Sequence, residues 1–598
     1  MAETQNIFPE ILRNQTFFYG KDFSGVINVP FALRPMPFPR NHFDHAVSLA
    51  PLFNTLIMRI CDDPQWLIQA LDQVAKIDDF VGHLLDLYRT VLSEGVEPRL
   101  VGVFRSDYML TPLHPRDPQQ RLPVGEEEMV MRQVEINTIS SSFISHGTSV
   151  FNLHHRRNPA VPANEALPKV AAALVQAHQA FCQALDPADG RVEPVFVLVG
   201  QPGERNLFDQ RLLLDRIEAA VRPPPTASPP THATPQPPPR TRSHARFLPL
   251  CGGGQGVRTM ILTMEQVATR GSLDAHKRLI LSDPTRPATA APLAVSVCYL
   301  RCGYTPKDYI SPKVGTPILT RPRHTLMGTR LPARSQCWEA RLLMERSRAW
   351  KCPTLGAQLA GCKRIQELLA QPGVVERFMG SDPAGCAALR SVFAAFYPLE
   401  KETYSSTLAM VRAQPLRYVL KPQREGGGNN FYGPVMVDLL TRCTTDPARV
   451  SEACPHLHSF TLMERLWPPR VPTILARDFR FFDDVQPQPQ PQSQPQPQPQ
   501  SQPQPPSVSC PLVIEVPRGP ARALLNNTEH SGHWEQGVYE QTDAVAELGI
   551  FSTLIVSPST GVLNSCEAGY LLRSKGAQFD DGGVAAGVAF LDAPELTA

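Results

Sequence analysis

Two oxygen-bearing side chains stand two positions apart in VEINTISSSF, residues 134–143. If this stretch is a strand, Glu135 and Asn137 point to the same face. A carboxylate next to an amide oxygen is a pair of hard oxygen ligands, the kind that Mg²⁺ prefers. The serines at 140–142 add hydroxyl and backbone donors, which suit an anionic ligand. An ordinary amphipathic strand with one polar face would show the same pattern, so this stretch alone leaves both interpretations open.

The glycine-rich stretch KPQREGGGNNFYG, residues 421–433, combines charge with an accessible backbone. Its glycines let the main chain approach a ligand closely, and exposed N–H groups of such loops can bind phosphate oxygens. Lys421 would add a positive charge for phosphate, and Glu425 could hold a Mg²⁺ ion that bridges phosphates. A hinge between strands is the alternative, but a hinge needs no cluster of charged and amide groups. The triplet in CGGGQG, residues 251–256, lacks these partners and is interpreted as a linker.

Three further polar clusters follow apolar stretches. In LLRSKGAQFDDGGVAAGVAFLD, residues 571–592, Arg573 and Lys575 share a face if the chain is extended, and a second glycine-rich run follows them. Two basic groups beside an accessible backbone suit an anionic substrate, although an ordinary C-terminal turn would also fit. The stretches FRSDYM, which contains Arg105, and ERNLFDQR, residues 204–211, are not specific on their own.

The elements that must position these clusters alternate between strands and helices. Short apolar runs typical of strands occur at 194–200, 293–304, 417–423, 459–466 and 544–556. Stretches with helical spacing occur at 208–221, 338–353 and 360–373, and the last two end in Pro or Gly. This mixture predicts an α/β or α+β architecture.

Low-complexity segments interrupt this pattern. Proline-rich sequence fills residues 223–247, a Pro/Gln repeat fills residues 486–506, and residues 311–334 are rich in Pro, Thr and Arg. Such segments bury too little apolar surface to fold, so we interpret them as surface insertions. Docking sites for proline-reading modules are the alternative interpretation.

Length and composition restrict the function classes. With 598 residues the chain is long enough for about two to four domains, and 42% hydrophobic residues allow large cores. A net charge of +2 without a basic stripe makes a nucleic-acid partner unexpected. No apolar run approaches the roughly 18 residues of a membrane span. Scattered cysteines and an N-terminus without signal-peptide features predict a cytoplasmic protein.

Taken in order, the motifs resemble those of eukaryotic-type glutathione synthetase from about residue 100 to the C-terminus. The resemblance is carried by RSDYM, EINTISSSF, ERNLFDQR, WEARLLMERS, QLAGCKRIQ, KPQREGGGNNFYG, LMERL, AELGIF, LLRSK and DGGVAAGVAFLD. It implies an α/β (α+β) ATP-grasp fold with an inserted substrate-binding α/β domain and a glycine-rich lid. It also implies ATP-dependent ligation of γ-L-glutamyl-L-cysteine to glycine through an acyl phosphate.

The resemblance implies three segments. Residues 1–189 would form the N-terminal part of the ATP-grasp domain, and residues 190–352 the inserted substrate domain with its insertion at 223–256. Residues 353–598 would form the C-terminal ATP-grasp part and the lid, with the insertion at 486–506. A homodimer is also implied.

The resemblance assigns roles by position. It implies Mg²⁺ ligands at Glu135, Asn137 and Glu425. It implies ATP contacts at Glu135, Lys363, Lys421, Glu425, Gly426, Gly427, Gly428, Asn429, Asn430, Tyr432, Met463, Glu464, Arg465, Leu466, Glu547, Lys575 and Asp581. Arg105 resembles the arginine that stabilises the acyl-transfer transition state. Substrate contacts are implied at Arg105, Ser140, Ser142, Asn206, Gln210, Arg301, Tyr304, Arg573, Val584 and Ala585.

Two other functions stay open at this point. A related ligase could add another amine, such as β-alanine, to the same acyl phosphate. A degenerate relative could be a non-catalytic interaction protein that uses its Pro/Gln tracts for docking. Five charged or amide groups in ligand-binding positions argue against degeneration, since a non-catalytic chain has no chemical use for them.

Overall fold

The computed structural model describes residues 16–19, 26–113, 128–220, 256–309, 336–400, 402–423, 429–442, 457, 459–483, 532–535, 538–580, 582–584 and 587–597. The segments interpreted as insertions, at 223–247, 311–334 and 486–506, lie outside the described residues, as does the linker at 251–256 apart from Gly256.

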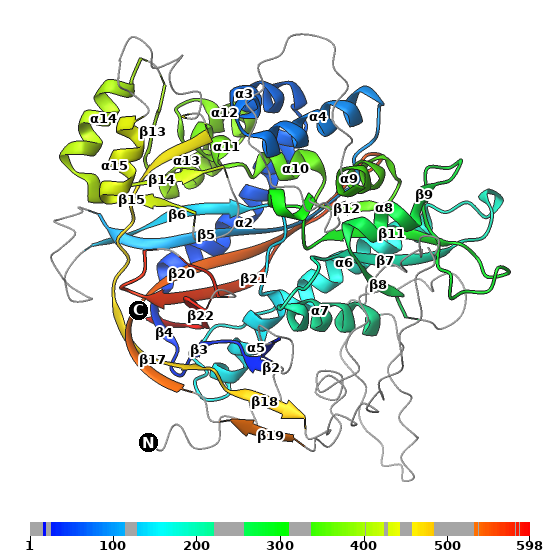
Figure 1. Cartoon of the computed structure of the whole chain (residues 1–598). Coiled ribbons are helices and arrows are strands. Elements are labelled where there is room, and N and C mark those ends of the chain that lie inside the picture. Colours follow the sequence, from blue (N-terminus) through cyan, green and yellow to red (C-terminus); the bar gives the residue numbers. More distant parts are fainter. Residues whose placement is uncertain are drawn as a thin grey trace, which may run out of the picture.

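One large mixed sheet crosses the molecule (Figure 1). Its strands run in the order β17 (Val471–Arg477), β3 (Phe31–Ala32), β22 (Ala589–Asp592), β21 (Gly561–Gly576), β20 (Val538–Ser557), β5 (Leu100–Pro112), β12 (Trp350–Cys352), β11 (Leu293–Leu300), β10 (Leu279–Leu281) and β9 (Gly271–Leu273). Beside this path, β6 (Met129–Asn137) pairs with β5, and β7 (Glu193–Val199) pairs with β11 and β8 (Thr259–Leu262).

At β5 an antiparallel group of strands meets a parallel group. Outside these two groups, β10 pairs antiparallel with β11 and β9, and β3 pairs parallel with β22. Strand β5 is antiparallel to β20 and β6, and parallel to β12. From β12 the parallel pairing continues through β11 and β7 to β8. Every residue of β11 is buried, as its sequence, apolar except for Ser296, predicts for a strand covered on both faces.

Neighbouring residues of the long strands face two separate cores. Ile550 of β20 packs in one core with helix α2 (Arg40–Cys61), whereas Phe551 packs in the other with helix α6 (Ala166–Gln183). The first core also contains helices α3 (Pro64–Ile77), α4 (Asp79–Ser93), α8 (Met264–Arg270), α9 (Gln336–Arg346), α10 (Leu355–Ala360), α11 (Lys363–Ala370), α12 (Val374–Met379) and α13 (Pro383–Val392). The second contains α5 (Ile144–His155) and α7 (Leu207–Ala219). Because successive side chains of a strand point to opposite faces, the helices cover both faces of the sheet.

A smaller antiparallel sheet lies apart from the large one, at the upper left of Figure 1. Its strands are β13 (Phe396–Tyr397), β16 (Phe460–Glu464), β14 (Tyr418–Pro422) and β15 (Phe431–Tyr432), and helices α14 (Tyr404–Ala413) and α15 (Gly433–Arg442) cover it. It has a core of its own around Tyr404, Met436 and Leu462. Strand β14 therefore carries Lys421 into a module separate from the large sheet.

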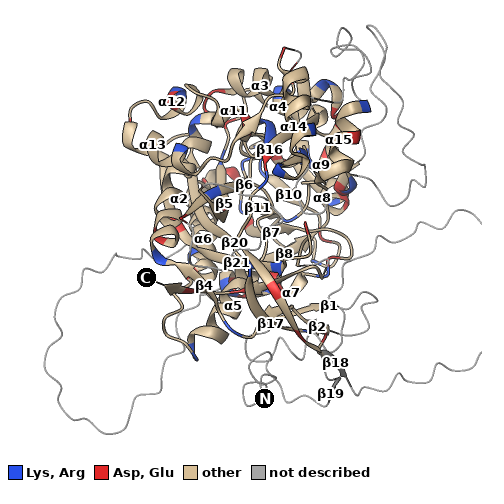
Figure 2. Cartoon of the chain, turned by 90° about the vertical axis from the view of Figure 1, so that its left-hand side faces the viewer, with Lys and Arg blue, Asp and Glu red and all other residues tan. Residues whose placement is uncertain are grey.

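Short elements complete the described fold. Strands β1 (Phe17–Tyr19), β2 (Val26–Asn28), β18 (Arg480–Asp483) and β19 (Gly532–Glu535) form one small sheet, and β4 (Met36–Pro39) pairs with β23 (Pro594–Thr597). Short 3-10 turns span Pro187–Asp189, Pro306–Tyr309 and Pro415–Arg417. In Figure 2 basic and acidic residues are interspersed over the outer helices.

The strands and helices expected from the sequence are mostly confirmed. The predicted strands correspond to β7, β11, β14, β16 and β20. The predicted helices correspond to α7, α9 and α11. The prediction of a helix over residues 338–353 was wrong at its C-terminal end. The helix ends at Arg346, and the chain continues into strand β12. The spacing of apolar residues at 338–353 does not show that residues 350–352 pair with β5 and β11 as a strand.

The Asp209 side chain of α7 caps the N-terminus of α5. Its carboxylate accepts hydrogen bonds from the backbone N–H groups of Phe143 (3.0 Å), Ser145 (2.9 Å) and His146 (3.0 Å). The N-cap residue, Phe143, has a left-handed φ of 68° and no side chain that could cap the helix. A carboxylate from another helix therefore satisfies N–H groups that would otherwise be buried without partners.

We expect Asp209→Ala to lower the free energy of unfolding by about 1–3 kcal/mol, because it leaves buried N–H groups unsatisfied. Urea unfolding followed by circular dichroism measures this. The control is Asp86→Ala, which removes a half-exposed partner of Arg89 and should change stability by less than about 0.5 kcal/mol. Equal effects of the two substitutions would contradict the capping role of Asp209.

Candidate active site

A cavity of about 570 Å³ lies between the small sheet, strands β5 and β6, and the end of β21. Most of the predicted site residues that the structure describes line this cavity. They are Arg105, Glu135, Asn137, Ser140, Ser142, Asn206, Tyr304, Lys363, Lys421, Asn430, Tyr432, Met463, Glu464, Arg465, Leu466, Glu547, Arg573, Lys575 and Val584. Residues more than 400 positions apart in the sequence thus share one cavity.

Other predicted site residues lie elsewhere. Gln210, Arg301 and Asn429 are described but do not line the cavity. Glu425, Gly426, Gly427, Gly428, Asp581 and Ala585 lie outside the described residues, so their predicted roles stay predictions.

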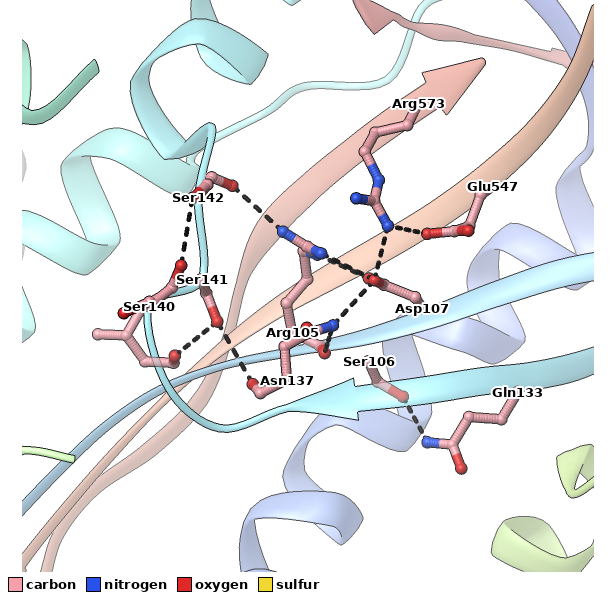
Figure 3. Close-up of polar contacts among 11 residues, drawn as sticks. Arg105, Ser106, Asp107, Gln133, Asn137, Ser140, Ser141, Ser142, Glu547 and Arg573 are labelled. Atoms are coloured by element: carbon pink, nitrogen blue, oxygen red, sulfur yellow. Dashed lines mark hydrogen bonds and ion pairs between the residues drawn. The ribbon is translucent and has the colours of Figure 1, made fainter. Parts of the chain in front are cut away.

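Asp107 lies behind the residues that line the cavity and is the centre of their polar network (Figure 3). This carboxylate is fully buried, and Arg105 donates to both of its oxygens at 2.7 and 2.8 Å. Arg573 donates to it at 3.0 Å and the Asn137 side chain at 2.9 Å. Two guanidinium groups and an amide from three strands are therefore fixed by one carboxylate.

Strand geometry brings this network together. Arg105 and Asp107 are two positions apart on β5 and so point to the same face. Gly549 of β20 lies opposite Asp107, and a Cβ atom at position 549 would come within 2.7 Å of the Asp107 carboxylate and 2.8 Å of the Arg105 side chain. A glycine at this position therefore leaves the space that the Arg105–Asp107 pair occupies.

A second charged group surrounds Glu135. Lys363, the first residue of α11, donates to the Glu135 carboxylate at 2.9 Å, and Lys421 of β14 donates to the Val134 carbonyl at 3.2 Å. Burial alone would raise the pKa of Glu135, but the positive charges of Lys363 and Lys421 outweigh burial and hold this pKa well below its usual range. Glu135 therefore stays ionised and paired with the Lys363 ammonium group.

Glu547 and Arg573 form a further ion pair at the base of the cavity. They face each other across β20 and β21 in register. Burial raises the pKa of Glu547, and Asp107 and Glu135 add to this increase against the effect of Arg573. Burial alone would lower the pKa of Arg573. The nearby Glu547 and Asp107 carboxylates outweigh burial and hold this pKa above its usual range. Arg573 thus stays positively charged between two carboxylates.

Arg301 holds the serine loop, residues 140–142, by hydrogen bonds. The Arg301 guanidinium donates at 2.7 Å to the carbonyls of Ser140 and Ser141 and to the Ser142 hydroxyl. Ser140 has a φ of 54°, a backbone conformation that residues other than glycine seldom adopt. In this structure Arg301 positions the loop that lines the cavity, and direct substrate contact by Arg301 stays a prediction.

Two amide oxygens near the cavity are buried without a hydrogen-bond partner among the described residues. They belong to Asn206 and Gln210. Glu204 orients both residues, because it accepts from the Asn206 backbone at 2.8 Å and from the Gln210 side chain at 3.2 Å. Asn206 lines the cavity, so its buried acceptor without a partner among the described residues favours a ligand that brings a hydrogen-bond donor.

The sequence interpretation did not single out Asp107, Glu204 or Gln201, although the latter two line the cavity. The spacing of Arg105 and Asp107 would have placed both on one face, by the same reasoning that paired Glu135 with Asn137. Gln201 gave no signal, because it reaches the site through contacts of 3.1 Å with Tyr304 and 2.7 Å with Asp308, about 100 residues away.

The donor set fits a magnesium ion in part. The Asn137 amide nitrogen donates to Asp107, which leaves its amide oxygen as the atom that could bind a cation. Glu135 is an ionised carboxylate two positions away. Among the described residues no group of three or more His, Cys, Asp or Glu side chains could hold a metal ion. A magnesium ion here would therefore need ligands beyond these two, such as Glu425 and phosphate oxygens.

Comparison with known families identifies the family to which the chain belongs. The model of the family described as "Eukaryotic glutathione synthase, ATP binding domain" matches residues 13–485 and 524–596. The chain belongs to the eukaryotic glutathione synthase family. The resemblance seen in the motifs is thereby confirmed over nearly the whole chain.

Curated relatives agree with this family. Glutathione synthetase of Mus musculus is 30% identical, covering 95% of this chain and 90% of the relative. That of Homo sapiens is 28% identical over 94% and 89%. The protein of Solanum lycopersicum named "Glutathione synthetase, chloroplastic" is 29% identical over 95% and 77%.

A solved structure supports the fold. A glutathione synthetase-like effector from Globodera pallida matches with a TM-score of 0.58 and 19% identity, over 100% of this chain and 96% of that one. The predicted α/β (α+β) fold of the ATP-grasp type is therefore confirmed, while the division at residues 189 and 352 stays a prediction.

The lowered pKa of Glu135 gives a pH-dependent prediction. Because this pKa is lower in the folded than in the unfolded chain, pairing of the ionised carboxylate stabilises the fold above the usual glutamate pKa of about 4.3. This contribution is lost progressively as the pH falls from that value through the lower folded pKa. We expect Glu135→Gln to lose roughly 3 kcal/mol of unfolding free energy at pH 7, because it removes the charged member of a buried ion pair with Lys363.

Urea unfolding of the wild type and of Glu135→Gln between pH 7 and pH 3.5 measures this, and the difference should narrow below about pH 4.3. The exposed Glu128→Gln on the same segment is the control and should show no such trend. A difference independent of pH would contradict the ion-paired state of Glu135.

Proposed function

We propose that this chain is an ATP-dependent carbon–nitrogen ligase that joins γ-L-glutamyl-L-cysteine to glycine and produces glutathione, ADP and phosphate. Membership of the glutathione synthase family and relatives named glutathione synthetase support this proposal. The observation that carries it is one cavity in which two ion-pair clusters meet, Glu135 with Lys363 and Asp107 with Arg105 and Arg573.

The reaction needs such an arrangement. A carboxylate is a poor electrophile toward an amine, so a carboxylate oxygen of the dipeptide first attacks the γ-phosphorus of ATP and ADP leaves. The glycine amine then attacks the carbonyl of the acyl phosphate, a proton is lost from nitrogen, and phosphate leaves. Negative charge grows on transferring oxygens in both steps, and preorganised cations stabilise it.

The two clusters suit different parts of this reaction. Lys363, Lys421 and Lys575 are the cations that we assign to the phosphates of ATP. Arg105 is assigned to the acyl group, since Asp107 fixes its guanidinium while its Nη1 atom reaches the Ser142 carbonyl at 3.3 Å. A site whose cations are already held by carboxylates needs little reorganisation when charge develops.

Magnesium, subunit state and location are also parts of the proposal. Glu135, Asn137 and Glu425 would hold Mg²⁺, which when bound would neutralise phosphate charge. A homodimer and a cytoplasmic location rest on the resemblance and on composition, and one relative is named as chloroplastic. In the described part of the chain, none of the helices combines the length and apolar character of a membrane span.

Phosphate release by the purified full-length chain tests this function. We expect release that depends on ATP, Mg²⁺, γ-glutamylcysteine and glycine together, with one glutathione formed per phosphate. Removal of the metal by EDTA should abolish turnover, and added Mg²⁺ should restore it.

Replacement of the amine separates the other possibilities. Faster release with β-alanine than with glycine would show a ligase for another amine. A folded chain that releases no phosphate with either amine would contradict the ligase function and favour an interaction protein.

A further inference from the structure

Asp580 connects two walls of the cavity that belong to different modules. Arg465 directly follows β16 of the small sheet, and its guanidinium group lies 2.5 Å from the Asp580 carboxylate. From the same module, the Tyr432 hydroxyl donates to the Asp580 carbonyl at 3.3 Å. Lys575, near the end of β21 in the large sheet, donates to that carbonyl at 2.5 Å. All four residues line the cavity.

Aromatic rings fix the guanidinium of this contact. The Arg465 Cζ atom lies 4.2 Å from the ring centroid of Trp467 and 4.9 Å from that of Tyr432. Its side chain is only 17% exposed, whereas that of Asp580 is 54% exposed. Stacking on aromatic faces restricts the planar group, so its N–H fork is already oriented when it meets a carboxylate.

The backbone around Arg465 is hydrogen-bonded both to the large sheet and within the small module. The Trp467 N–H donates to the Thr111 hydroxyl of β5 at 3.2 Å, and the Arg465 N–H donates to the Arg417 carbonyl at 2.8 Å. Asp580 lies two positions before Gly582, the first residue of the glycine-rich stretch 582–587, and Gly582 has a φ of 152°. The carboxylate of Asp580 therefore joins a well-anchored arginine to the chain just before this glycine-rich stretch.

We propose that Asp580 is a positioning residue, which holds Arg465 through its carboxylate and Lys575 through its carbonyl so that both cations face the nucleotide across the cavity. The proposal rests on the proposed function only for the identity of the nucleotide. If the contact orders both walls around that ligand, then its loss speeds nucleotide dissociation more than it changes the fold. The 54% exposure of Asp580 keeps the expected effect moderate.

The test uses the full-length chain and a non-hydrolysable ATP analogue, adenylyl imidodiphosphate, with Mg²⁺. We expect Asp580→Asn, which keeps size and carbonyl but removes the charge, to weaken binding about three- to tenfold in calorimetry. The dissociation rate in stopped-flow displacement should rise by a similar factor. The control is Asp438→Asn on α15 of the same module, which removes an exposed partner of Arg442 and should leave both quantities unchanged.

A double-mutant cycle with Arg465→Gln separates positioning from a general structural effect. The two substitutions should be less than additive in binding free energy, because each removes the same contact. Additive effects, or binding by Asp580→Asn equal to that of the wild type, would overturn the proposal. So would a melting temperature of Asp580→Asn several degrees below that of Asp438→Asn, since that would indicate a merely structural role.

The outcomes also distinguish this proposal from the proposed function. A wild-type chain that binds the analogue and shows the Asp580 effect, yet forms no glutathione, would contradict the ligase function alone. A wild-type chain that forms glutathione with an Asp580→Asn variant of unchanged nucleotide affinity would contradict the positioning role alone. A wild type that binds no analogue would overturn both.

Discussion

The site depends on one fully buried carboxylate, that of Asp107. A buried charge is unfavourable unless it is paired and hydrogen-bonded, and Asp107 has Arg105, Arg573 and Asn137 around it. Strand β5 lies between β6 and β20, so one residue on β5 can reach groups carried by its neighbours. The same low-dielectric surroundings that make an unpaired charge unfavourable make this geometry rigid. The cations of the cavity wall are consequently in place before any substrate arrives.

The rest of the cavity repeats this arrangement with other charges. Glu135 is held by Lys363, and Arg301 holds the serine loop by hydrogen bonds. Each cation is oriented by an acceptor of the chain, and the large sheet, the small sheet and α11 each contribute. Anions that enter the site therefore meet preorganised positive charge, which is the property that transfer of a phosphoryl group to a carboxylate requires. The fold works as a scaffold that brings distant segments to one place.

Local sequence patterns predicted many residues of this site. They did not predict the contacts between residues that lie far apart in the sequence. The two-residue spacing of strands placed Glu135 beside Asn137 and Arg573 beside Lys575, and both pairs line the cavity. The central role of Asp107 and the contact of Asp580 with Arg465 depend on strand pairing and on residues about 115 positions apart. Neither spacing nor composition carries that information. The helix predicted at 338–353 ended early for the same reason, since the pairing partners of β12 are far away in sequence.

The most direct measurement is kcat/KM for γ-glutamylcysteine in Asp107→Asn, compared with the affinity of the same variant for the ATP analogue. The account predicts a fall in kcat/KM of at least about 100-fold, because Arg105 and Arg573 lose the group that orients them. Nucleotide affinity should change far less, since Glu135 and the lysines hold that part of the cavity. A folded Asp107→Asn variant whose kcat/KM stays within about threefold of the wild type would contradict the central role of this carboxylate.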